Sequence, residues 1–440
     1  MIKPQSRPAP RPDAAGPPPD PRTGRRRAWV VTALIVTFML VNYADKSVLG
    51  LAAVPIMDEL QISNSTYGLI SSSFALLFSV SGMVVGFASS RLSCRVLLFV
   101  MAGVWAVAQL PVLFVASVPA LMAGRVLLGA AEGPAASMSM HALYKWFPED
   151  RRGLPSALQI SGAALGTLIA APVVTWLISV FGWRSAFAAL AVTSVVWSLL
   201  WWRAGHDGPY GHEPAHGATS GSGPATRLPY RALLVNGTVL GSIAGAFGAS
   251  WALALSQAWL PPYLRTQLGM SPGGAATLIS GVSAFSFVLL LAVSPLVDAL
   301  KRRGVSSRWS SGAPQGIAVG VAGLAMAALP FTDARALLLV LLAVAFGAHA
   351  IAFPLHYMTT AAVVPPAQRG AVFGVVAATG TLPGLIAPYL TGHLLDSAPS
   401  QGAGYTRAFL LSAAVMLVCG LVALTAIRPE RDVRQPGPTA

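Results

Sequence analysis

The sequence predicts an all-α membrane protein with twelve transmembrane helices in two pseudo-symmetric six-helix bundles. Its 440 residues are 55% apolar and only 10% charged, whereas ordinary soluble domains are about 25% charged. Twelve apolar stretches approach the roughly 20 residues that an α-helix needs to cross a bilayer. In addition, short motifs of the first half of the chain return in the second half at nearly constant offsets.

The predicted spans follow one another along the chain with mostly short connections. They cover residues 28–57, 66–90, 95–116, 119–145, 153–180, 184–203, 231–260, 272–297, 312–330, 335–363, 369–396 and 405–427. The Pro- and Arg-rich segment 1–27 is expected to be a disordered cytoplasmic N-terminus. The longest polar connection, 204–230, is expected to be a cytoplasmic linker between an N-terminal bundle (28–203) and a C-terminal bundle (231–427). Residues 428–440 are expected to form a cytoplasmic tail.

Three groups of residues support the internal repeat. In order, they are Leu60, Ile62 and Ser63 with Leu268, Met270 and Ser271; Pro148, Arg152 and Gly153 with Pro365, Arg369 and Gly370; and Ala171, Pro172 and Thr175 with Ala387, Pro388 and Thr391. Chance matches in a chain rich in Ala, Gly and Pro are the alternative explanation. Parallel six-helix repeats with a binding site between them are a standard plan of membrane transporters.

The distribution of positive charge predicts the topology. With both termini in the cytoplasm, 23 of the 29 Lys and Arg residues lie inside, four outside and two within the membrane, as the positive-inside rule requires. The basic loops are therefore expected to contact anionic lipids rather than nucleic acid. We also expect a monomeric, multi-pass protein of the bacterial inner membrane. The two cysteines, Cys94 and Cys419, predict no structural disulfide.

Four ionisable residues lie in the interior of two predicted spans: Asp45 and Lys46 in the first, Arg125 and Glu132 in the fourth. A charge at the bilayer centre costs about 2.5 to 3.5 kcal/mol, so such residues usually face a cavity, pair with one another and mark a path for ions or substrate. Arg125 and Glu132, seven residues apart, share one helix face about 10 Å apart. A static network of buried ion pairs that holds the two helices together is the alternative.

Motifs around these charges resemble a known family. The architecture is similar to that of the major facilitator superfamily, and Asn42–Lys46 resembles the Asn-Tyr-x-Asp-Arg signature of its anion:cation symporter branch, which includes hexuronate, galactonate and phthalate transporters. The fourth span and the loop after it resemble the same branch at Gly124, Arg125, Gly129, Glu132, Gly133, Trp146, Phe147, Pro148, Arg152 and Gly153. The resemblance implies the fold of that superfamily and secondary active transport of a small organic anion.

The resemblance also implies roles for individual residues. Asp45 and Glu132 would carry the coupling protons, and Lys46 and Arg125, with Asn42 nearby, would hold the substrate anion. An arriving carboxylate would compete for the two cations and release the two acids, which then favour protonation in a low-dielectric site. Protons are thus the expected coupling ion, and no cofactor, metal or enzymatic activity is expected.

Departures from the family pattern bear on the substrate and on gating. Lys46 replaces the usual Arg, so a compact ammonium takes the place of a two-pronged donor and a different geometry of the bound anion is expected. Phe78 replaces a typical Tyr and Ala163 a Gln, which removes groups suited to hydroxyls and favours an apolar or aromatic acid over a sugar acid. Ser90 and Ser93 replace the Asp and the second Gly of the loop between helices 2 and 3. The residues assigned to cytoplasmic gating are Arg91, Arg95, Arg152, Asp298, Arg302 and Arg369.

Second-half residues complete the predicted site. The repeat offset places His349 opposite Glu132; it either faces the cavity, where it could bind an anion or carry a proton, or packs between helices. Gln257 and Thr379 are expected to line the cavity, although polar side chains in lipid often only bridge helices. Two other functions remain open at this stage: an exporter or antiporter of a metabolite or drug, and a transporter-like sensor.

Overall fold

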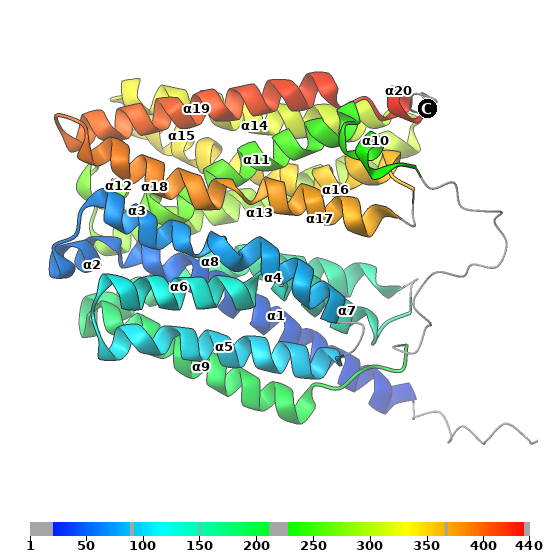
Figure 1. The fold of residues 1–440 in the computed structure, drawn as a ribbon, viewed down its shortest axis with the longest axis horizontal. Helices are drawn as coiled ribbons and strands as arrows, with labels where there is room; N and C mark the ends of the chain where they lie inside the picture. The colour runs from blue at the N-terminus through cyan, green and yellow to red at the C-terminus, as the bar shows by residue number, and fades with distance from the viewer. Residues whose placement is uncertain (1–20, 89–91, 149–150, 211–227, 366–367, 435–440) are drawn as a thin grey trace, which may run out of the picture.

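A computed structural model describes residues 21–88, 92–148, 151–210, 228–365 and 368–434, and these are helical with no strand. The helices of the first half are α1 (Pro21–Leu51), α2 (Ala53–Leu60), α3 (Asn64–Ser73), α4 (Ala75–Ala88), α5 (Cys94–Phe114), α6 (Val118–Glu132), α7 (Ala135–Tyr144), α8 (Gly153–Phe181) and α9 (Trp183–Ala204). Figure 1 shows them as a bundle of long rods, coloured blue to green.

The second half forms a matching bundle beside the first (Figure 1). Its helices are α10 (Tyr230–Leu234), α11 (Gly237–Ala258), α12 (Leu260–Thr266), α13 (Pro272–Arg302), the π-helix η2 (Arg308–Gly312), α14 (Ala313–Ala328), the 3₁₀-helix η3 (Leu329–Phe331), α15 (Arg335–Gly347), the 3₁₀-helix η4 (Ala348–Ile351), α16 (Ala352–Val363), α17 (Arg369–Gly380), α18 (Pro383–Asp396), α19 (Gln401–Ala426) and α20 (Pro429–Arg434).

Ten helical stretches of the described residues are long and apolar enough to cross a membrane. The other two predicted spans, 66–90 and 119–145, are each formed by two successive helices, α3 with α4 and α6 with α7. Proline explains the second interruption, because Pro134 has no N–H to donate to the carbonyl four residues earlier. Pro55, the third residue of α2, likewise cannot donate to the carbonyl of Leu51, so the first predicted span ends at Leu51 rather than at 57.

Two seams join the halves. Helix α3 packs against α18, and α8 packs against α13. The predicted repeat relates the second span (α3 with α4) to the eighth (α13), and the fifth span (α8) to the eleventh (α17 with α18). It therefore relates the α3–α18 contact to the α8–α13 contact. The two-bundle fold class is confirmed, while the exact domain boundaries stay predictions. Most of the predicted linker and of the segment 1–27 lies outside the described residues, and α1 begins at Pro21, seven residues before the predicted span.

We call the end of the bundle where α1 begins and α20 ends the terminal end, and the opposite end the distal end; they lie at the right and left of Figure 1. Large apolar side chains such as Val100 and Trp176 lie exposed on the outside of the bundle, where a membrane would cover them. The interior of the first half holds the charged residues of the predicted site, with Asp45, Arg125 and Glu132 all buried.

Candidate functional site

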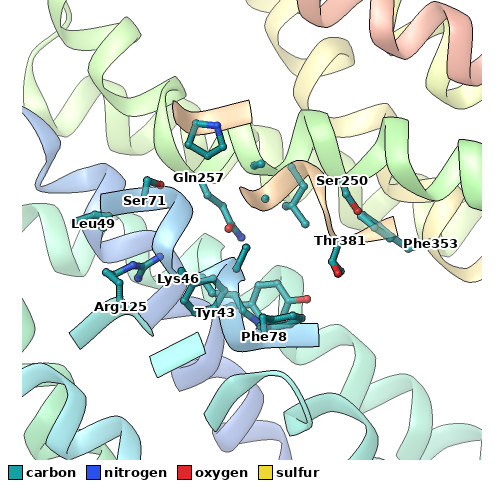
Figure 2. Close-up of a pocket in the computed structure, with 16 residues that line it drawn as sticks. Tyr43, Lys46, Leu49, Ser71, Phe78, Arg125, Ser250, Gln257, Phe353 and Thr381 are labelled. Atoms are coloured by element: carbon teal, nitrogen blue, oxygen red, sulfur yellow. The ribbon is translucent and has the colours of Figure 1, made fainter. Parts of the chain in front are cut away.

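A cavity of about 160 Å³ lies between the two halves (Figure 2). Helices α1, α3, α4 and α6 line it from the first half, and α11, α16, α18 and the turn before α18 from the second. The lining residues are Tyr43, Lys46, Leu49, Ser71, Phe74, Ala75, Phe78, Arg125, Ser250, Leu253, Ala254, Gln257, Phe353, Thr381, Gly384 and Pro388. Two cations therefore face a largely apolar space.

Two glycines bring α6 close to the cavity wall. A Cβ on Gly129 would lie 1.9 Å from the carbonyl oxygen of Phe74, and a Cβ on Gly133 would lie 1.9 Å from that of Phe78. Only glycine permits so close an approach of the two backbones. The contact sets Arg125, one turn before Gly129, directly beside the aromatic wall.

Lys46 forms the only ion pair that the described residues place within the four-residue charged cluster. Its Nζ lies 3.3 Å from Oε2 of Glu132 and donates to Oδ1 of Asn42 at 2.6 Å, one helical turn earlier. The ammonium also lies 4.4 Å from the centre of the Tyr43 ring and 5.4 Å from that of Phe78. Glu132 is thus behind Lys46 and does not itself line the cavity.

Asp45 points away from the cavity, into the first half. Gln109 of α5 donates a hydrogen bond from Nε2 to Oδ1 of Asp45 at 2.9 Å. Both side chains are buried, and Oδ2 of Asp45 has no hydrogen-bond partner among the described residues. An ionised carboxylate in such surroundings is costly, so this environment suits an acid that holds a proton.

Arg125 is a buried cation that faces the cavity and has no acidic partner among the described residues. Its Nη1 donates a long hydrogen bond, 3.4 Å, to the backbone carbonyl of Asp45, and its guanidinium lies 4.6 Å from the centre of the Phe74 ring. Within the described part of the chain no carboxylate oxygen lies within 4.0 Å of it, and its Nε has no hydrogen-bond partner. The guanidinium of Arg125 is planar and always charged, and without such a partner it is suited to bind a carboxylate ligand.

The other predicted site residues are divided between the cavity wall and its surroundings. Phe78 and Gln257 line the cavity, whereas the Thr379 hydroxyl donates to the carbonyl of Val375 within its own helix and is not a lining residue. His349 is buried in η4, and its ring stands edge-on to Phe353 with centroids 6.1 Å apart. It therefore lies behind a wall residue.

Ala163 belongs to α8, but its side chain is outside those described. The roles assigned to these residues as ligands stay predictions.

The predicted gating residues make local contacts. Arg152 donates to the carbonyl of Phe147 at 3.0 Å, and Arg369 donates to that of Val364 at 3.1 Å. In both cases the acceptor lies five residues earlier, so the repeat extends to side-chain geometry. The guanidinium of Arg95 lies 4.7 Å from the centre of the Trp202 ring within the first half.

The remaining gating positions lie in or near the second half. Asp298 lines a second cavity of about 210 Å³ between α13 and the η4–α16 segment, and Arg302 belongs to the last turn of α13. Arg91 and Ser90 lie outside the described residues. Within the part of the chain that the structure describes, Asp298 and Arg302 form no hydrogen bond or ion pair with the first half.

The halves are instead joined near the distal end of the bundle. Asp396, at the end of α18, accepts hydrogen bonds from the backbone N–H groups of Asn64 and Ser65, at 3.1 and 2.7 Å, and from the Asn64 amide at 2.8 Å. The Tyr67 hydroxyl donates to the Ala258 carbonyl at 3.0 Å. The cavity is therefore closed toward the distal end.

Sequence reasoning missed two important partners. Gln109 is an amide within an otherwise apolar helix, which was a usable signal, because a buried amide in lipid needs a partner. Asp396 sits at the predicted end of a span and carried no signal for a contact with Asn64, more than 300 residues away.

A bundle of membrane-spanning rods in two repeated halves, with a charged cavity between them, defines a membrane transporter. Comparison with known families gives the same class: the family model "Major Facilitator Superfamily" matches residues 34–388 and 305–440. The chain belongs to this superfamily. The matching proteins are transporters, which confirms that the chain is not an enzyme.

Curated relatives confirm the resemblance to the anion:cation symporter branch. A hexuronate transporter of Bacillus subtilis is 27% identical over 404 residues, which cover 89% of this chain and 92% of the relative. A D-galactonate transporter of Escherichia coli is 26% identical, covering 94% and 98%. A probable sulfoacetate transporter of Cupriavidus necator is 26% identical, covering 92% and 95%. The relatives named here are transporters of organic anions.

Solved structures agree on the fold. An inward-facing bacterial homolog of the human lysosomal transporter Spinster superposes with a TM-score of 0.76 at 17% identity, covering 93% of this chain and 99% of the other. A D-xylose-proton symporter gives a TM-score of 0.73 at 15% identity, covering 92% and 99%. At these identities the likeness establishes the arrangement of helices alone.

Proposed function

We propose that this protein takes up a small organic anion together with protons across the bacterial inner membrane. The observation that carries the proposal is Arg125, a buried guanidinium that lines the cavity between the halves without a carboxylate partner among the described residues. A buried unpaired charge is expensive, so a conformation that keeps one open is suited to receiving a ligand of opposite charge.

The anion lies between the two cations, with its carboxylate on Arg125 and Lys46. The body of the substrate then meets the rings of Tyr43, Phe74 and Phe78. The named relatives carry hexuronate, galactonate and sulfoacetate, so anionic cargo is the shared feature. The apolar wall of this cavity favours a less hydroxylated acid, apolar or aromatic, because hydroxyl groups without hydrogen-bond partners are costly to bury.

The proposed proton coupling rests on the ion pair between Lys46 and Glu132, which lies behind the residues that line the cavity. Glu132 is held by Lys46 at 3.3 Å, and a substrate carboxylate that draws Lys46 toward the cavity weakens this pair. Glu132, left in a low-dielectric site without its cation, then favours protonation. Binding of the anion and of the proton therefore favour each other reciprocally. Asp45, whose carboxylate has no Lys or Arg nitrogen within 4.0 Å among the described residues, is the second proposed carrier.

Two proton carriers imply movement of net charge. A membrane potential opposes entry of an anion by about 2.3 kcal/mol per charge per 100 mV. One proton per monoanion would make the cycle electrically neutral, whereas two protons would let a negative interior drive uptake. We propose two protons, a monomeric transporter, and both termini in the cytoplasm, where most basic residues lie.

The test is uptake of labelled benzoate, hexuronate and short monocarboxylates and dicarboxylates into proteoliposomes, with an inward proton gradient and an imposed potential varied separately. We expect acid outside to stimulate uptake of an aromatic or apolar acid, and a negative interior to increase it further. The variant Glu132→Gln should lose accumulation but retain exchange of substrate across the membrane, because the uncharged amide can still pair with Lys46.

Asp333→Asn, a change at an exposed acid in the loop before α15, is the matched control and should accumulate substrate normally. Accumulation that survives unchanged in Glu132→Gln would remove this residue from the coupling mechanism. Efflux driven by an inward proton gradient would identify an antiporter instead.

A further inference from the structure

The hydrogen bond between Gln109 and Asp45 links the proposed proton carrier to a helix that does not line the cavity. Gln109 is 3% exposed, Asp45 is fully buried, and Nε2 donates to Oδ1 at 2.9 Å. Helix α5, which carries Gln109, packs against α6 and α9. Gln109 therefore reaches Asp45 from behind and cannot contact a substrate in the cavity.

The position of Gln109 is fixed by close packing of α5 on α6. A Cβ on Gly124 of α6 would lie 2.5 Å from the carbonyl oxygen of Ala108, the residue before Gln109. Arg125, the residue after Gly124, donates to the backbone carbonyl of Asp45. The same helix contact thus sets both the amide and the guanidinium against Asp45.

The two carboxyl oxygens of Asp45 differ in their hydrogen bonding. Oδ1 accepts the Gln109 hydrogen bond, whereas Oδ2 is buried and has no hydrogen-bond partner among the described residues. The charged groups that interact electrostatically with Asp45 are Lys46 on its own helix and Arg125 and Glu132 on α6. Helices α8 and α9 also pack on α1, but among the described residues they bring no titratable group to Asp45.

We propose that Gln109 is a positioning residue for proton transfer: it holds Oδ1 of Asp45 and leaves Oδ2 as the atom that gains and loses the coupling proton. This inference rests on the proposed function, because it assumes that Asp45 carries a proton during transport. A donated hydrogen bond stabilises the ionised carboxylate. Gln109 therefore lets Asp45 release its proton at a pH at which an unsupported buried acid would retain it.

Infrared difference spectroscopy of the protein in lipid tests this without a known substrate, since protons are the only ligand needed. The carboxylic-acid C=O band of Asp45 is assigned by its loss in Asp45→Asn. In Gln109→Met, which keeps the approximate shape but removes the donor, this band should move to higher frequency. Its titration midpoint should rise by about one pH unit, the size expected for one hydrogen bond to a charged group.

The chain offers a matched control in Gln159. This buried amide of α8 donates to the Ser139 hydroxyl at 2.9 Å, so Gln159→Met removes an interhelical amide hydrogen bond of the same bundle without touching an acid. If Gln109 only bridges helices, both methionine variants should lower the melting temperature and neither should move the Asp45 band. We expect the band and its midpoint to move in Gln109→Met alone.

The possible failures are distinguishable. If an Asp45 band titrates in the wild type and titrates identically in Gln109→Met, the positioning role is overturned while the proposed symport stands. If no Asp45 band titrates in the wild type, Asp45 is no proton carrier, and both the inference and that part of the proposed function fail. A Gln109→Met protein that does not fold is replaced by Gln109→Leu, for which the same band shift is expected.

Discussion

Replacing Asp396 by alanine should shift the transporter toward a conformation in which the two halves separate at the distal end. The Asp396 carboxylate belongs to the second half, yet it accepts hydrogen bonds from the first two N–H groups of α3 in the first half. These are N–H groups that a helix cannot satisfy internally. A transporter that exposes its cavity alternately to the two sides must break this contact once in every cycle.

The size of the effect follows from the geometry. A side chain that caps a helix N-terminus contributes about 0.5 to 2 kcal/mol, and its charge contributes about 0.3 to 1 kcal/mol when exposed. Asp396 is exposed to solvent, so a value of about 1 kcal/mol is appropriate. This corresponds to about a fivefold change in the ratio of the two conformations. Asp396→Asn keeps an acceptor oxygen but loses the charge, and should have a smaller effect.

Distances between spin labels at the exposed positions 58 and 399, in a background without the two native cysteines, measure the separation of the halves at the distal end. Asp396→Ala should raise the population of the long distance about fivefold. Asp333→Ala, a change to another exposed acid, should leave it unchanged. Equal distance distributions in wild type and Asp396→Ala would show that this contact does not contribute to the conformational equilibrium.

Three further predictions concern packing, pH and recognition. Gly50→Ala should destabilise the distally closed state, since a Cβ there would lie 1.9 Å from the carbonyl oxygen of Gln257; unchanged label distances would contradict this. Hydrogen bonds from Arg184 and Trp183 hold the pKa of Glu59, in the α2 segment outside the membrane spans, below its ordinary value. Its stabilisation is therefore complete above the ordinary glutamate pKa of about 4.3 and is lost as the pH falls through the lowered pKa of the folded state. Glu59→Gln should accordingly lower the melting temperature more at pH 7 than at pH 3, and a difference independent of pH would refute the assignment. Arg125→Lys should raise the KM for a carboxylate substrate about tenfold or more, because the two-pronged donor is lost; an unchanged KM in the uptake assay would place the carboxylate elsewhere.

The class of protein and the location of its charges were determined by the sequence alone. A bilayer core requires long apolar helices and makes each charge within them costly, so composition and spacing identify both the spans and residues such as Asp45 and Glu132. The repeat was visible for a similar reason. Arg152 and Arg369 each bind a carbonyl five residues earlier, a local contact that a short motif can encode.

Only the tertiary structure decided which of these charges meet. Spacing along α6 put Arg125 about 10 Å from Glu132 but did not identify a partner for either residue. The packing of α1 against α6 pairs Lys46 with Glu132 and leaves Arg125 facing the cavity. Distances between helices depend on close contacts such as those at Gly124 and Gly129, which periodicity within one helix does not report. For the same reason the sequence could place Gln109 and Asp396 in their helices but could not identify the partner of either side chain.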